Sequence, residues 1–386
     1  MQANRLIFSI AALLLLAGCG SQRTQEQATR SPAQVQAEIV RLLPAKAADP
    51  KGWARDIQVA FTAQDISPTT QNLCSVLAVT EQESTFQVDP SVPGLGKIAR
   101  EEIDRRAASA HIPGLLVSGA LKLDSPNGKS YSDRLNAARS EKELSAIFDD
   151  FIGMASMGKT LFGGFNPVHT GGPMQVSIAY AEQHAKARPY PYPVEGSIRH
   201  EVFTRRGGMY FGIAHLLDYP APYDSALYRF ADFNAGHYAS RNAAFQNAVS
   251  LASGIPLDLD GDLLRHGDDA DERPGATELA VRTMSGTLGL SGAEIRRQLA
   301  QGEADGFERS TLYRRVFERA DTLERKPLPR ALLPRIVLKS PKITRRLTTE
   351  WFAGRVDARH RRCLERGAGS PLAQRLNWPA APAAAP

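Results

Sequence analysis

The 386-residue sequence lacks several motifs that mark common classes of enzyme. It has no phosphate-binding glycine loop, no nucleophilic serine elbow and no internal repeat, which excludes the usual signatures of nucleotide-dependent enzymes, serine hydrolases and repeat proteins. It has only three cysteines, and their spacing is not that of a zinc site. The acidic segment from Leu257 to Asp262 lacks the glycine and glutamate positions of a calcium loop, which indicates a solvated turn. We therefore expect no metal and no cofactor.

No apolar run reaches the ~20 residues of a membrane-spanning helix. The run from Leu6 to Leu16 is shorter, follows Arg5 and ends before Ala17-Gly18-Cys19. A basic start, a short apolar run and small residues before a cysteine are typical of a bacterial lipoprotein signal. We predict that residues 1–18 are removed and that Cys19 carries lipid chains such as palmitate. An ordinary secretion signal with an incidental cysteine is the alternative.

The residues after Cys19 indicate where such a lipoprotein resides. Gly20 stands where inner-membrane retention uses an aspartate, so we expect the periplasmic face of the outer membrane, within the cell envelope. Residues 19–30 are polar and show no apolar periodicity, which predicts a flexible tether. In this oxidising compartment Cys74 and Cys363 either pair as a disulfide, or Cys74 packs as a buried free thiol.

Charged residues make up only 23% of the chain, but their balance is basic, with a net charge of +6 and a pI near 9.2. Arginine pairs accumulate late in the sequence, at 296–297, 314–315, 345–346 and 361–362. We expect no nucleic-acid partner outside the cytoplasm, whereas the anionic peptide stems of peptidoglycan suit this charge. The alternative is that these pairs lie on solvated helix faces.

Apolar residues at helical spacing predict an α-helical N-terminal region. Ser31-Pro32 is typical of a helix start, a second helix is expected from about Trp53 to Ala63, and Ser67-Pro68 opens a third. Glu83 follows the apolar Val76 of this third helix by seven residues, or about two turns, and so faces inward.

An inward-facing glutamate has a specific chemical use. Burial raises the pKa of a carboxyl group, which a general acid working near neutral pH requires. We therefore assign this role to Glu83. Glu81, four residues after the apolar Leu77, is a competing candidate, and a glutamate exposed at the helix end is the structural alternative.

Three segments follow one another in a recognisable order: Glu83-Ser84, Gly172-Pro173-Met174-Gln175 and Phe233-Asn234-Ala235-Gly236. This order resembles the lytic transglycosylases of the goose-type lysozyme superfamily. The resemblance implies a mainly α, lysozyme-like domain over residues 31–255, interrupted by a long insertion at about 91–170. Residues 256–378 are expected to form a C-terminal helical region, and residues 379–386, which contain only alanine and proline, a disordered tail.

The resemblance also implies roles for single residues. Glu83 is the catalytic acid and base, and the sugar-binding residues are Ser84, Met174, Gln175, Tyr210, Phe233 and Asn234. The sequence departs from the family pattern at Pro173, which replaces leucine, and at Phe233, which replaces a tyrosine that lies near the acid. Tyr238 or Tyr210 would have to supply the missing hydroxyl.

The activity that the resemblance implies is cleavage of the MurNAc-GlcNAc bond of peptidoglycan by a lyase that forms a 1,6-anhydro sugar without water. No second carboxylate is then needed, which agrees with the absence of an obvious partner acid. Two alternatives stay open at this point. One is a hydrolytic goose-type lysozyme, and the other is a non-catalytic wall-binding or structural lipoprotein that retains the fold.

Overall fold

The computed structural model describes residues 30–154, 166–265, 273–338 and 345–369. This part of the chain is mainly α-helical and contains one two-stranded sheet, so the predicted fold class is confirmed at the level of mainly α. Within these residues, none of the helices combines the length and the hydrophobicity that crossing a membrane requires. The predicted signal peptide, nearly all of the tether, Cys19 and the C-terminal tail lie outside the described residues.

The chain begins with three helices, α2 (Pro32–Leu42), α3 (Pro50–Ala63) and α4 (Thr70–Ser84). The side chains of Ser31, Asp49 and Thr69 accept hydrogen bonds from backbone amides of the first turns, which otherwise lack partners. The predicted start at Ser31-Pro32 is confirmed, with a capping box and proline in the first turn. The apolar faces of the three helices enter one core.

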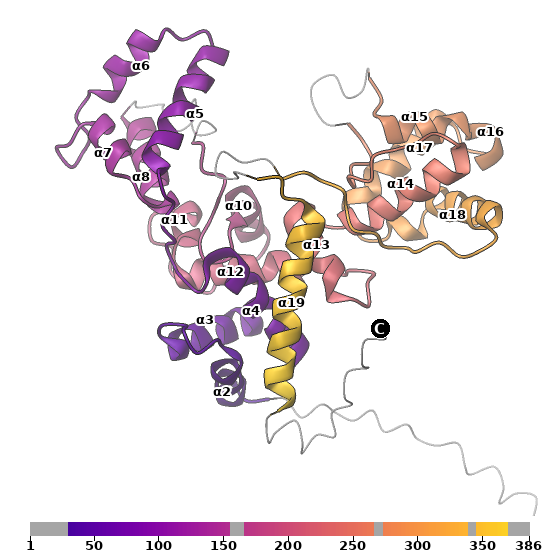
Figure 1. The fold of residues 1–386 in the computed structure, drawn as a ribbon, viewed down its shortest axis with the longest axis horizontal. Helices are drawn as coiled ribbons and strands as arrows, with labels where there is room; N and C mark the ends of the chain where they lie inside the picture. The colour runs from indigo at the N-terminus through magenta and orange to yellow at the C-terminus, as the bar shows by residue number, and fades with distance from the viewer. Residues whose placement is uncertain (1–29, 155–165, 266–272, 339–344, 370–386) are drawn as a thin grey trace, which may run out of the picture.

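The part of the insertion that the structure describes forms four helices, α5 (Leu95–Ser109), α6 (Gly114–Leu121), α7 (Tyr131–Ala137) and α8 (Glu141–Gly153). They make the lobe at the upper left of Figure 1. The start of the insertion contacts the start of α8, because Val92 N donates to Arg139 O at 2.8 Å and Ser140 Oγ donates to Asp89 Oδ2 at 2.9 Å. Helices α5–α7 therefore form an excursion that returns beside the segment that follows Glu83.

The chain then forms a short antiparallel hairpin, β1 (Thr170–Gly171) and β2 (Val176–Ser177). Four helices follow: α10 (Ile178–Ala187), α11 (Ile198–Val202), α12 (Arg205–Leu217) and α13 (Ala226–Ala235). Helix α12 is buried along most of its length, and its glycines allow neighbouring segments to approach its backbone closely.

A second hydrophobic cluster is built from α14 (Ala239–Ser253), α15 (Ala276–Thr283), α16 (Ser285–Leu288), α17 (Gly292–Leu299) and α18 (Thr311–Glu324). Two short 3-10 helices, η2 (Ala300–Glu303) and η3 (Phe307–Arg309), connect the last two of these. Figure 1 shows this group at the right, on the side away from α5–α8. Helix α14 contributes apolar residues to this second cluster, although it falls within the range 31–255 predicted to be lysozyme-like.

The last helix, α19 (Thr349–Ala368), returns to the first group and packs against α4 and α13. Cys363 of α19 is bonded to Cys74 of α4, so the pairing that the sequence left open is present. The range 256–378, expected as one C-terminal helical region, thus contains helices that join two different hydrophobic cores.

Candidate functional site

Glu83 lies in the last turn of α4 and is half-buried. The helix ends sharply after Ser84, because Thr85 and Phe86 both adopt left-handed backbone conformations, with φ of 51° and 61°. Such conformations cost non-glycine residues roughly 1–2 kcal/mol each. Packing of the Phe86 ring edge-on against Trp53, with 5.5 Å between the centroids, holds this turn. Strained backbone of this kind is concentrated at functional sites.

The structure separates the two glutamates that the sequence left in competition. Glu81 Oε1 lies 3.6 Å from Nε of Arg359 on α19. Two residues along an α-helix turn the side chain by about 200°, so Glu83 is directed away from α19. Glu81 therefore has an ionic partner in α19, and Glu83 lies about 200° around α4 from it.

The turn of the hairpin carries Met174 and Gln175. Met174 is fully buried against α12, at a position where a Cβ on Gly212 would lie 2.6 Å from its sulfur. Gln175 has a φ of 50° and uses its amide within the protein. Its Nε2 donates to Glu141 Oε2 at 2.9 Å, and its Oε1 accepts from Thr170 Oγ1 at 3.1 Å.

Helix α8 links this amide to the segment that follows Glu83. Ser140, the N-cap of α8, bonds Asp89, and the next residue, Glu141, bonds Gln175. Two successive residues of the insertion thus connect the end of the Glu83 segment with the hairpin turn. The insertion is part of this region and does not merely extend from it.

The third segment ends α13. Phe233 is buried, and its ring lies 5.1 Å from the imidazole of His215 on α12. Asn234 is exposed, and its Oδ1 accepts a hydrogen bond of 2.9 Å from Thr349 Oγ1 at the start of α19. Gly236, with a φ of 105°, ends the helix in a conformation that favours glycine.

The helix that ends in Glu83-Ser84, the hairpin turn and the end of α13 all contact α12. Thr80 of α4 lies 3.8 Å from the sulfur of Met209, Met174 of the hairpin packs on Gly212, and Phe233 of α13 packs on His215. These contacts come from residues 80 to 233, far apart in sequence, and they place the motif segments around one central helix. Glu83, Gln175 and Asn234 keep solvent-accessible atoms, whereas Met174, Tyr210 and Phe233 contact protein.

Both tyrosines proposed as substitutes for the missing hydroxyl pack against other protein groups, and the hydroxyl of Tyr210 is already hydrogen-bonded. The hydroxyl of Tyr210 donates to Pro189 O at 3.1 Å, and the helix that carries this residue is held by a bond from Gln64 Nε2 to the Tyr210 carbonyl. The ring of Tyr238 packs under the guanidinium of Arg241, 4.2 Å from its centroid. Direct sugar contacts by Tyr210 and Met174 therefore stay predictions.

Sequence reasoning missed a buried cluster of histidines and tyrosines beside Phe233. His215 stacks on His237 with 4.6 Å between centroids, and His237 stacks on Tyr219 at 4.1 Å. Burial, and to a lesser extent the neighbouring His237, lowers the pKa of His215 to about 3. Its imidazole is therefore uncharged. Burial also lowers the pKa values of His184 and His237. The residues come singly from separate elements, so no spacing in the sequence marks them.

Asp232, the residue before Phe233, was also missed. It is completely buried and accepts hydrogen bonds from the hydroxyls of Tyr219 and Tyr223 and from the backbone amides of Tyr238 and Ser240. Burial raises the pKa of Asp232, while the hydrogen bonds from Ser240, Tyr223 and Tyr219 act in the opposite direction. Asp232 thereby caps the start of α14 and joins the first group of helices to the second.

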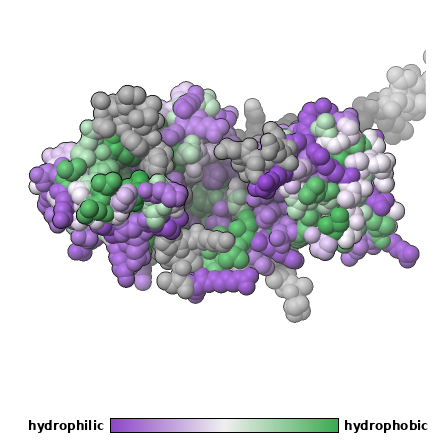
Figure 2. Space-filling view, turned by 90° about the horizontal axis from the view of Figure 1, so that it is seen from above, coloured by the Kyte–Doolittle hydropathy of each residue, from purple (hydrophilic) through white to green (hydrophobic). Residues whose placement is uncertain are grey.

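Among the described residues, no cluster of three or more His, Cys, Asp or Glu side chains is arranged to hold a metal ion. Seen from above in Figure 2, the surface is hollowed between the lobe of α5–α8 and that of α14–α18.

Comparison with known proteins gives two matches. The family model described as "Protein of unknown function (DUF1615)" matches residues 46–366. The Escherichia coli strain K12 protein named "Uncharacterized protein YaiW" is 58% identical over 358 residues, which cover 92% of this chain and 97% of that relative. No solved structure matches the chain.

Proposed function

The chain belongs to the DUF1615 family, and we propose that it cuts the glycan strands of peptidoglycan by lytic transglycosylation with Glu83 as its acid and base. In this proposal α2–α4, the hairpin and α12–α13 form a lysozyme-like domain. The protein is anchored by lipid on Cys19 at the periplasmic face of the outer membrane.

The single observation that carries the proposal is that the helix ending in Glu83, the hairpin turn and the end of α13 all contact α12. Their order in the sequence alone is a weak signal, since each is a common turn or helix end. Packing of Met209, Gly212 and His215 against these segments supports the idea that they form one site. The bridge from Asp89 through Ser140 and Glu141 to Gln175 supports it independently.

The chemistry needs one proton-transferring group. Glu83 protonates the glycosidic oxygen that leaves C1 of N-acetylmuramic acid, and this bond breaks. The 6-hydroxyl of the same sugar then bonds to C1 and returns its proton to Glu83, which gives the 1,6-anhydro end. Because the nucleophile belongs to the substrate, a second carboxylate is unnecessary.

A second candidate function is a non-catalytic, wall-binding lipoprotein that retains this fold. Phe233 supplies no hydroxyl, and both polar atoms of the Gln175 amide already bond to protein groups. These two features favour binding without turnover.

Digestion of purified sacculi followed by mass analysis of the soluble products tests the proposal. Anhydro-ended muropeptides are the expected result. Reducing ends would indicate a hydrolytic lysozyme, and sacculus binding without any released product would favour the second candidate.

A further inference from the structure

Four arginines recur along one side of helix α19, at Arg355, Arg359, Arg362 and Arg366. Their spacing keeps them within one stripe of an α-helix, and this arginine row is about 16 Å long. Positive charge is in excess around it, because residues 345–369 contain seven arginines, no lysine and three acids. The acids fall outside the stripe, at Glu350, Asp357 and Glu365.

The arginine row borders the contacts of α19 with α2 and α4. Arg366 donates from Nε and Nη2 to Leu42 O at the end of α2, at 3.1 and 2.9 Å. Arg359 Nε lies 3.6 Å from Glu81 Oε1 on α4. The acids of these two helices are fewer than the arginines of the row, since α4 contains only Glu81 and Glu83, and the Glu38 of α2 is paired with Arg30.

Most of the charge of the arginine row is left for an external partner. Arg355 and Arg362 are exposed, and neither forms an ion pair with another described residue. Burial lowers the pKa of Arg359, and the charges of Arg355 and Arg362 lower it further against the opposing effect of Glu81. Like charges three or four residues apart destabilise a helix, so a bound anion would relieve this repulsion.

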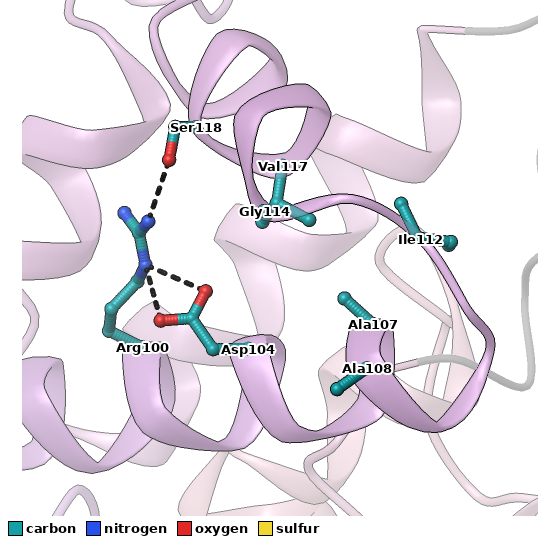
Figure 3. A pocket seen from close by; sticks show the side chains of 8 residues that line it. All are labelled: Arg100, Asp104, Ala107, Ala108, Ile112, Gly114, Val117 and Ser118. Atoms are coloured by element: carbon teal, nitrogen blue, oxygen red, sulfur yellow. Dashed lines mark hydrogen bonds and ion pairs between the residues drawn. The ribbon is translucent and has the colours of Figure 1, made fainter.

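Arginines of the insertion differ in this respect. Figure 3 shows Arg100 of α5 bonded to Asp104 and to Ser118. Arg105 pairs with Glu102 on the same helix. These guanidinium groups are neutralised by their own helix, whereas Arg355 and Arg362 on α19 are not.

The arginine row extends towards the end of α4 that carries Glu83. Helix α19 runs antiparallel to α4, because the contact of Arg359 with Glu81 lies before the disulfide along α19 and after it along α4. Arg355 is one further turn in the same direction. A polymer held at Glu83 therefore has the arginine row beside it along α19, as the neighbouring positions of α4 and α19 in Figure 1 illustrate.

We propose that the arginine row binds the carboxylates of peptidoglycan peptide stems whose glycan lies at Glu83. The proposal rests on the proposed function, which supplies the polymer. A guanidinium binds a carboxylate through two parallel hydrogen bonds, and an extended peptide of about five residues spans the length of the row. An extended chain can follow a row beside two packed helices, whereas a flat bilayer reaches only its protruding members.

Co-sedimentation with purified sacculi tests the proposal. The chain from Gly20 to Pro386 retains every residue that the structure describes, and Glu83→Gln is used as the background so that no glycan is cut. We expect binding to weaken at high salt. Adding Arg355→Gln, Arg362→Gln should weaken it about tenfold, and Arg355→Glu, Arg362→Glu should weaken it further.

The matched control is Arg297→Gln, Arg314→Gln on α17 and α18, which removes the same charge from two exposed arginines elsewhere. It should bind sacculi as the background chain does. Conversion of the stem carboxylates to neutral amides should abolish the difference between the row variant and the control. Equal binding by these two variants, unchanged binding to amidated sacculi, or binding of anionic vesicles in place of sacculi would overturn the proposal.

The outcomes separate this proposal from glycan cleavage. Anhydro products from the chain with Glu83 intact, together with full sacculus binding by the row variant, would reject the stem-binding surface alone. Loss of binding by the row variant, without any anhydro product from the unmodified chain, would reject the cleavage alone.

Discussion

Cys74 of α4 and Cys363 of α19 are bonded across 289 residues, with their Cα atoms 5.5 Å apart. The bond fixes the final helix against the helix that ends in Glu83. Arg359 lies about one turn before Cys363 on the same helix and makes an ionic contact with Glu81. The position of the candidate acid thus depends on a residue near the other end of the chain.

The disulfide should contribute measurably to stability. We expect Cys74→Ala, Cys363→Ala to lower the free energy of unfolding by about 2–5 kcal/mol, because the bond restricts the unfolded chain. Urea unfolding monitored by circular dichroism measures the change. Reductant should destabilise the unmodified protein and leave the double variant unaffected; an unchanged midpoint on reduction would contradict the bond.

Replacing the candidate acid separates catalysis from binding. Glu83→Gln removes the proton donor while it keeps the shape of the side chain, so release of soluble muropeptides should fall by about 10²–10⁴-fold. Sacculus binding, measured by co-sedimentation, should persist. Glu81→Gln is the matched control and should retain activity, since Glu81 faces Arg359. Equal activity of Glu83→Gln and the unmodified protein would reject the proposed role.

The contact between Met174 and α12 should tolerate no added methyl group. In Gly212→Ala the new Cβ would lie 2.6 Å from the Met174 sulfur, so the hairpin must shift. We expect a loss of about 1–3 kcal/mol in unfolding free energy and reduced glycan cleavage.

Gly354→Ala is the control for this substitution. Gly354 lies inside α19 with open space around its Cβ position, so alanine should stabilise the protein by about 0.5–1 kcal/mol. Thermal unfolding of both variants compares the two sites. A neutral effect of Gly212→Ala would show that the hairpin is not held by this contact.

Because it contains buried, uncharged histidines, the folded protein should lose free energy of unfolding as the pH falls. The pKa of His215 is about 3 in the folded protein, below the ordinary value of 6.5, so the unfolded chain binds the proton first as the pH falls. Between these two values the free energy of unfolding should decrease by about 1.4 kcal/mol per pH unit from this residue. His184 and His237 act in the same direction.

Urea unfolding of the protein and of His215→Phe at a series of pH values measures this slope. The variant should depend less on pH below about 6, because it has lost one titrating group. His200→Gln, at an exposed position, serves as the control and should keep the original slope. Identical slopes for the protein and His215→Phe would contradict the burial of an uncharged imidazole.

Local signals in the sequence predicted local structure well. Ser31-Pro32 marked the start of α2 correctly, whereas the third helix, expected to open at Ser67-Pro68, is capped two residues later by Thr69 and has no proline in its first turn. The apolar periodicity of the third helix likewise located Glu83 at its end. These features depend on neighbours that the sequence itself displays.

Long-range relationships could not be predicted in the same way. The sequence of α14 does not indicate which core the helix joins, and it joins the second. The ionic contact of Glu81 depends on the distant Arg359, and the state of Cys74 depends on Cys363. Asp232 and His215 acquire their environments only when separate elements pack together, so their surroundings are invisible in a linear pattern.

The return of α19 to α4 also determines when folding can finish. During synthesis the chain emerges from its N-terminus, and the face of α4 that α19 covers has no partner until residues 349–368 follow. Contacts between residues so distant in sequence form slowly. The first group of helices is therefore completed only when α19 joins it, whereas the second group needs contacts only between residues that lie nearer in sequence.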